Sequence, residues 1–254
     1  MKQTLILILA ALLLGGCASS PSTPGSGPQT QEDARVKTLV DLGTGYLRQG
    51  EYARAKEHLN RALSIDSRSA TAHNALALVF QLEQEYEIAE THFKAALRAN
   101  SEASTKVRNN YGAFLFELGR YDDAIRQLEI ASEDRYYTSR PTVFENLGVS
   151  YLRIGDARQA EAAFERAVAL NPDQPKALIE LAAILFERQD YVRARQYYLR
   201  YQRVAQQTSK SLWLCVRLAR VFEDANQEAS CALALRNIFP ASPEYAEYQE
   251  SLGS

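Results

Sequence analysis

The chain has 254 residues, of which 46% are hydrophobic and 24% are charged, so it has enough apolar side chains for a folded core and is not wholly disordered. Its 29 lysines and arginines nearly balance its 31 aspartates and glutamates, which gives a net charge of -2. Without a basic surplus, the composition gives no support for binding to nucleic acid.

Residues 1–16 have the pattern of a secretory signal peptide. Lys2 is followed by an apolar run from Leu5 to Leu14, then by two glycines and Cys17. The run is too short to cross a hydrocarbon core of about 30 Å as a helix. The Leu-Gly-Gly-Cys string resembles a bacterial lipobox, and this resemblance implies that Cys17 is the site of lipid attachment. The alternative is an ordinary secretory signal that contains a cysteine by chance.

Residues 17–33 are expected to form a flexible tether. They are rich in Ser, Pro and Gly and have no apolar periodicity, so they bury too little surface to fold. Acyl chains on Cys17 would anchor the tether in a bilayer, because each buried CH₂ contributes about 0.8 kcal/mol. Ala18 stands where lipoproteins of the inner membrane usually have Asp, and this resemblance implies the periplasmic face of the outer membrane.

From residue 34 to residue 254 the sequence repeats with a period of about 34 residues, which is typical of TPR helix pairs. Each copy has one small residue in its first helix and another in its second, as expected where antiparallel helices approach closely. The two are twelve residues apart in all six copies: Gly43 and Ala55, Ala77 and Ala89, Gly112 and Ala124, Gly148 and Ala160, Ala182 and Ala194, and Ala219 and Cys231. The sequence therefore predicts an all-α TPR solenoid.

The predicted repeats cover residues 36–69, 70–103, 105–138, 141–174, 175–208 and 212–245, and a capping helix follows around residues 243–252. Gly50, Gly119 and Gly155 mark turns within repeats, since glycine commonly ends a helix in the left-handed conformation. Residues 132–141 predict an enlarged loop between repeats three and four. This loop is either solvated, with packed tyrosines, or a binding loop.

No group of residues in the sequence resembles a catalytic or metal site. His58, His73 and His92 fall on predicted helices, without the His-Glu-x2-His or paired Cys-x2-Cys spacing of metal sites. His58 and His92 occupy the same repeat position, which favours a scaffold role. No phosphate-binding glycine pattern occurs either. We therefore expect no enzyme activity, no cofactor, no metal and no small-molecule substrate.

Cys215 and Cys231 are the two cysteines that remain if Cys17 is acylated. An even pair in an oxidising compartment can form a disulfide. The repeat pattern places the two on adjacent antiparallel helices with an offset of about one turn, which makes the geometry borderline. They are either bridged or two small buried hydrophobic residues.

The first helices of TPR proteins line a concave groove, so candidate contact residues can be counted from the small position. The predicted floor is mainly apolar and suits an amphipathic helix or an extended segment of a protein partner. Alternatively, its large apolar side chains pack between repeats. The candidates are Val40, Thr44 and Leu47 in repeat one, Asn74, Leu78 and Gln81 in repeat two, Asn109, Ala113 and Phe116 in repeat three, Glu145, Val149 and Leu152 in repeat four, and Ile179, Ala183 and Phe186 in repeat five.

The combination of a lipobox, a short tether and about six TPR units resembles the PilF/PilW family of type IV pilus biogenesis lipoproteins, also called pilotins. The resemblance covers nearly all of the mature chain and is strongest in residues 109–112, 143–148, 191–198 and 217–224. It implies an outer-membrane lipoprotein that binds the secretin, the ring-shaped channel of the pilus, and assists its localisation and multimerisation. The lipid bilayer would be a second partner, through acylated Cys17.

Two other functions compete with this expectation. A lipoprotein TPR adaptor for another envelope machine, such as secretion or cell-wall synthesis, would share the anchor and the repeats. A periplasmic hydrolase regulator, or the hydrolase itself, belongs to a different class, and the hydrolase would need a catalytic group that the sequence does not display.

Overall fold

The computed structural model describes residues 28–99 and 103–253, and over these ranges it contains thirteen α-helices and no strand. Twelve of them form six antiparallel pairs, numbered here one to six. The pairs are α1 (Pro28–Arg48) and α2 (Tyr52–Ile65), α3 (Ala70–Leu82) and α4 (Tyr86–Arg98), α5 (Ser104–Glu117) and α6 (Tyr121–Ser132), α7 (Arg140–Arg153) and α8 (Ala157–Leu170), α9 (Pro175–Glu187) and α10 (Tyr191–Val204), and α11 (Ser209–Val221) and α12 (Ala225–Ile238); α13 (Pro243–Glu250) follows.

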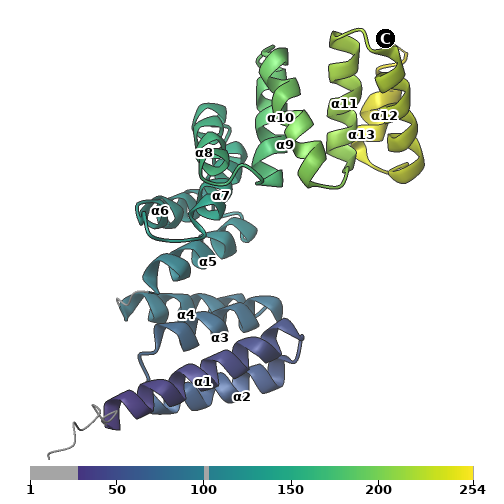
Figure 1. The fold of residues 1–254 in the computed structure, drawn as a ribbon. Helices are drawn as coiled ribbons and strands as arrows, with labels where there is room; N and C mark the ends of the chain where they lie inside the picture. The colour runs from purple at the N-terminus through teal and green to yellow at the C-terminus, as the bar shows by residue number, and fades with distance from the viewer. Residues whose placement is uncertain (1–27, 100–102, 254) are drawn as a thin grey trace, which may run out of the picture.

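The pairs stack side by side in chain order, and the direction of the helix axes turns along the stack (Figure 1). Helix α1 lies at one end of this elongated body and α13 at the other. Each pair contacts its neighbours in the chain, so the buried side chains form clusters along the length of the stack. The predicted all-α TPR solenoid is confirmed.

Small residues allow the two helices of a pair to meet. A Cβ atom added to Gly148 would lie 2.5 Å from the ring of Phe164, and one added to Gly43 or Gly112 would lie 2.6 Å from a leucine of the partner helix. Ala182 takes the same position in pair five and is fully buried. The small position of the repeat is therefore a helix–helix contact.

A residue with left-handed backbone ends the first helix of every pair. Gly50, Gly119 and Gly155 have φ angles of 76°, 73° and 81°. The other three pairs use Gln84, Gln189 and Glu223, with φ between 56° and 63°. The next N–H then donates to a carbonyl five residues back, as from Asp190 to Leu185 at 2.9 Å. This hydrogen bond closes a Schellman motif, which ends a helix and starts the turn.

The sixth repeat begins three residues earlier than predicted. Glu223 has left-handed backbone and Asp224 caps α12, each 34 residues after the equivalent residues Gln189 and Asp190 of pair five. The crossing positions of pair six are therefore Val216 and Glu228. The prediction of Ala219 and Cys231 was wrong because it followed small side chains, and the residues at the equivalent positions of this repeat are valine and glutamate. The repeat covers residues 209–242 rather than 212–245.

The corrected register also aligns the two cysteines. In an antiparallel pair that crosses at Val216 and Glu228, Cys215 and Cys231 lie at nearly the same level rather than a turn apart. They form a disulfide between α11 and α12, with Cα atoms 6.1 Å apart, within the range that disulfides span. Of the two alternatives, the structure has the bridged one.

The N-terminal helix begins inside the predicted tether. Helix α1 starts at Pro28, so residues 28–33 are helical rather than flexible. Proline suits the first turn of a helix because its ring fixes φ and its missing N–H has no helical partner there. The predicted signal peptide, Cys17 and the rest of the tether lie outside the described residues. In the part of the chain that the structure describes, no helix has the length and apolar character needed to span a membrane.

Candidate partner-binding face

The first helices α1, α3, α5, α7, α9 and α11 contact one another in order and form one surface, here called the first-helix face. All fifteen predicted groove residues lie on the first five of these helices. Asn74, Asn109 and Ile179 are buried, and the other twelve are partly buried. The structure therefore brings the candidates together in one continuous row, but it gives several of them packing roles as well.

Asparagine side chains link neighbouring first helices within this row. Nδ2 of Asn110 donates to Oδ1 of Asn74 at 3.1 Å, and Nδ2 of Asn146 donates to Oδ1 of Asn109 at 3.2 Å. Corresponding residues of successive repeats thus make the same hydrogen bond. Buried amides need such partners, so these bonds hold the register between one first helix and the next.

Glu145 stands on α7 where pairs two and three have a buried asparagine. Burial raises the pKa of its carboxyl group, and the charge of Lys176 opposes that shift. Nε2 of Gln174 donates to it at 3.3 Å. A half-buried carboxylate with few donors is a strong acceptor, so this position favours a partner that brings an N–H group or a cation.

The large apolar side chains of the face are held by aromatic and cationic neighbours. The rings of Phe116 and Tyr121 lie 5.3 Å apart, and the guanidinium of Arg153 lies 5.9 Å from the centre of Phe116. Phe186 likewise packs against Tyr191 at 5.1 Å. Both rings remain only partly buried. These side chains therefore pack between repeats and also remain partly accessible to a partner. The two interpretations drawn from the sequence, partner contact and packing, do not exclude each other.

Sequence reasoning missed the part of the face on pair six. In the corrected register Trp213, Arg217 and Arg220 occupy the positions of the candidates on α9. The guanidinium of Arg217 lies 4.5 Å from the centre of the Phe186 ring and 5.5 Å from that of Trp213. Nε1 of Trp213 donates to Glu247 of α13 at 2.7 Å. Alignment on the capping residues Asp190 and Asp224, instead of on small residues, would have found this aromatic and cationic end.

The enlarged loop spans residues 133–139, whereas the loops that lead into α3, α9 and α11 have four residues each. Asp134 anchors the loop, because one carboxylate oxygen accepts from the hydroxyl of Thr105 at 2.8 Å and the other from the N–H of Tyr136 at 2.9 Å. Tyr137 packs on the core, but the side chain of Tyr136 is 96% exposed. The loop thus has one packed tyrosine and one that is free to contact a partner.

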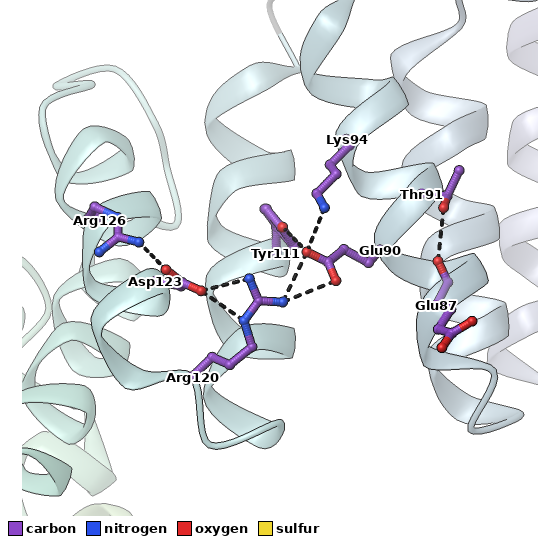
Figure 2. Close-up of polar contacts among 8 residues, drawn as sticks. All are labelled: Glu87, Glu90, Thr91, Lys94, Tyr111, Arg120, Asp123 and Arg126. Carbon is purple, nitrogen blue, oxygen red and sulfur yellow. Dashed lines mark hydrogen bonds and ion pairs between the residues drawn. The ribbon is translucent and has the colours of Figure 1, made fainter.

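A charged network joins pairs two and three away from these residues (Figure 2). Glu90 of α4 accepts hydrogen bonds from the hydroxyl of Tyr111 at 2.7 Å, from Arg120 at 3.0 Å and from Lys94 at 2.9 Å. Burial alone would raise the pKa of Glu90, but these three donors together lower it to about 2. A carboxylate with this many partners is a structural link rather than a general base.

Comparison with known proteins identifies the family. Tetratricopeptide-repeat models match residues 103–173 and 146–209, and a TPR-repeat model matches residues 43–84. The type IV pilus assembly protein PilF of Pseudomonas aeruginosa is 41% identical over 248 residues, which are 98% of this chain and 98% of that protein. The chain belongs to the PilF/PilW family. It is a TPR protein of type IV pilus biogenesis.

Solved structures of the family have the same fold as this chain. The structure of P. aeruginosa PilF matches with a TM-score of 0.84 and 42% identity, over 87% of this chain and 99% of that one. The crystal structure of PilW, a widely conserved type IV pilus biogenesis factor, matches with a TM-score of 0.71 and 26% identity, over 84% and 98% of the two chains. The solenoid of PilF/PilW proteins is therefore the scaffold on which the first-helix face is built.

Proposed function

We propose that this protein is an outer-membrane lipoprotein whose first-helix face binds the type IV pilus secretin and assists its localisation and multimerisation. The observation that carries the proposal is the 41% identity to PilF along 98% of both chains. Identity over such a length includes the surface residues as well as the buried repeat positions, so a common partner is the simplest reason for it.

The chemistry of the first-helix face supports a protein partner. Half-buried leucine and phenylalanine side chains, such as Leu47, Leu78 and Phe186, alternate along it with amides and with Glu145. Apolar anchors surrounded by polar groups are typical of surfaces that hold a helix or an extended segment. In the described residues no three His, Cys, Asp or Glu side chains gather as metal ligands.

In this proposal, the lipid anchor on Cys17 determines where the protein acts. Two or more acyl chains on Cys17 would hold the protein on the membrane far longer than one chain does. The secretin subunit would then meet a scaffold that is already on the membrane into which it inserts. The first-helix face would cover apolar surface of the subunit until multimerisation buries it.

The test compares secretin assembly in three strains: one with the protein, one without it, and one with Cys17→Ala. We expect heat-resistant secretin multimers in the outer-membrane fraction of the first strain, their loss in the second, and multimers in the wrong fraction in the third. Unchanged assembly in the deletion strain would refute secretin binding as the function. A TPR adaptor for another envelope machine would then be the better assignment.

A pair of surface variants tests the face itself. Ala183→Arg adds a long cation to the first-helix face of α9, and Ala229→Arg adds the same group to an exposed position of α12. We expect the first to reduce co-purification of the secretin at least about tenfold and the second to leave it unchanged, since a buried unpaired charge costs more than 1.4 kcal/mol. Equal binding by both variants would place the contact elsewhere.

A further inference from the structure

Two histidine side chains meet across pair two, although the sequence predicted only a scaffold role for them. His73 of α3 and His92 of α4 have their Nδ1 atoms 2.9 Å apart and their ring centroids 5.2 Å apart. One of the two Nδ1 atoms must carry a proton and the other a lone pair for this contact to be a hydrogen bond. The contact therefore brings two imidazole nitrogens close enough to share one ion.

The second nitrogen of His73 decides which atom carries the proton. Nε2 of His73 lies 3.2 Å from the carbonyl oxygen of Ser67. A carbonyl oxygen only accepts, so Nε2 is protonated and Nδ1 of the neutral ring offers its lone pair toward His92. A ring N–H held by a backbone carbonyl is the arrangement that orients metal-binding histidines through their other nitrogen.

The spacing fits metal coordination. Two nitrogens at about 2.05 Å from one ion are about 2.9 Å apart at a right angle and about 3.3 Å apart in a tetrahedron. The observed 2.9 Å therefore matches the nitrogen spacing of tetragonal or octahedral Ni²⁺ or Cu²⁺, and a rotation of the rings would aim both lone pairs at the ion. Tetrahedral Zn²⁺ needs an opening of only a few tenths of an ångström, together with a small rotation that aims both lone pairs at one point.

The surroundings leave room for the remaining ligands. A cavity of about 420 Å³ adjoins both rings, and Thr91 contributes to its wall. The ring of Phe80 stacks on His92 with centroids 5.4 Å apart and holds its orientation. Arg68 and Arg98 line the same cavity and repel a cation, and in the described residues no third His, Cys, Asp or Glu joins the pair. Water would complete the coordination, and the affinity would be micromolar rather than nanomolar.

We propose that His73 and His92 form a two-imidazole site for a divalent transition-metal ion of the Ni²⁺, Cu²⁺ and Zn²⁺ group. On binding, the proton on Nδ1 of His92 moves through solvent to Nε2, so that both rings ligate as neutral imidazoles and no net proton is released. The ion replaces one hydrogen bond with two metal–nitrogen bonds between α3 and α4. It thereby stabilises pair two without a role in any reaction.

The test is titration calorimetry with Zn²⁺ and with Ni²⁺ on the full chain carrying Cys17→Ala and no affinity tag. The substitution removes the one thiol that is not in the disulfide, so neither cysteine nor tag binds metal. We expect one ion per chain with micromolar Kd and a rise in Tm on addition of metal. His73→Gln and His92→Gln should each weaken binding at least about tenfold. His58→Gln is the matched control, because His58 holds the same repeat position as His92 but stacks on Tyr46, and it should bind as before.

A second measurement does not depend on the folding of the variants. The chain has three histidines, so ring ¹⁵N NMR signals can be assigned individually. We expect the Nδ1 signals of His73 and His92, and not those of His58, to shift on addition of Zn²⁺. The proposal is wrong if no saturable binding occurs up to about 1 mM metal, or if His58→Gln loses as much binding as the other two variants.

Discussion

Pair four and pair six of the solenoid hold their two helices together by different means. In pair four, Gly148 lets α7 approach until the ring of Phe164 fills the space that a side chain would occupy. In pair six, the equivalent positions are Val216 and Glu228, the small Ala232 stands where pair four has Phe164, and the Cys215–Cys231 disulfide joins the helices in addition to their packing. The internal pair is therefore held by close packing, and the last pair has a covalent bond in addition to its packing.

The difference follows from position in the stack. Pair four is covered on both sides by pairs three and five, whereas pair six has only the short helix α13 beyond it. In a repeat protein each unit is stabilised mainly by its neighbours, so the last unit receives less stabilisation from packing than an internal unit does. A disulfide offsets this loss without a second neighbour, because it restricts the unfolded chain as well as the folded one.

Removal of the disulfide should have the largest effect. We expect Cys215→Ala with Cys231→Ala to destabilise pair six by about 3 kcal/mol, because the bridge closes a loop of about fifteen residues. Hydrogen exchange should accelerate in α11, α12 and α13 and stay unchanged in pair four. Reductant should reproduce the effect in the wild-type chain and do nothing to the double variant. Equal protection of pair six in both chains would show that the bridge does not hold it.

A methyl group at the crossing of pair four should have the next largest effect. Gly148→Ala places a carbon 2.5 Å from the fully buried Phe164 ring, and such overpacking costs about 1–3 kcal/mol. The helix propensity of alanine offsets about 1 kcal/mol of this cost. Chemical denaturation should therefore show a net loss of up to about 2 kcal/mol.

Gly45→Ala is the matched control for this substitution. Gly45 is also helical, but a Cβ atom there meets nothing within 4 Å. The same change should therefore stabilise α1 by up to about 1 kcal/mol. A gain of stability in both variants would show that the contact with Phe164 yields easily and that pair four does not depend on it.

The contacts between the paired helices also explain how much of the structure could be predicted from the sequence. The six repeats, their order and the row of candidates from Val40 to Phe186 follow from spacing alone, because each repeat carries the same local signals. Pair six was placed three residues too late, since Ala219 and Cys231 are also two small residues twelve apart. The spacing of small residues was misleading in this pair, because Val216 and Glu228 stand at the positions equivalent to Gly148 and Ala160.

Contacts between residues far apart in the sequence could not be predicted. His73 and His92 have no metal-site spacing, and their meeting depends on how α3 and α4 lie against each other. The same holds for Glu90, whose partners Tyr111 and Arg120 come from the next pair. The repeat pattern predicts which helices touch but does not say which polar groups meet between them.

The Glu90 network joins two pairs by electrostatic contacts rather than by packing or a covalent bond. Its contribution to stability should therefore depend on pH. The folded-state pKa of Glu90 is lowered from 4.5 to about 2, so its contribution to stability is present above pH 4.5 and is lost as the pH falls toward 2. We expect this contribution to the free energy of unfolding to be about 1–2 kcal/mol. It is smaller than the pKa shift alone implies, because the side chains of Arg120 and Lys94 are exposed and water screens their charges.

The measurement compares the free energy of unfolding of the wild-type chain and of Glu90→Gln between pH 7 and pH 2.5. The difference between the two chains should be largest near pH 7 and shrink steadily below pH 4.5. A difference that stayed constant with pH would mean that Glu90 acts through hydrogen bonds alone and not through its charge.

The smallest expected effect concerns the turns. Gln189 of pair five has a φ of 63°, in the left-handed region where Gly155 of pair four has 81°. A side chain costs about 1–2 kcal/mol in this conformation, whereas glycine adopts it freely but loses more entropy on folding. We expect Gln189→Gly to stabilise the protein by about 0.5 kcal/mol and Gly155→Ala to destabilise it by about 1 kcal/mol. Opposite signs in urea denaturation would show that both turns need the same backbone conformation, and equal signs would show that the side chain of Gln189 supplies a contact that compensates for its strain.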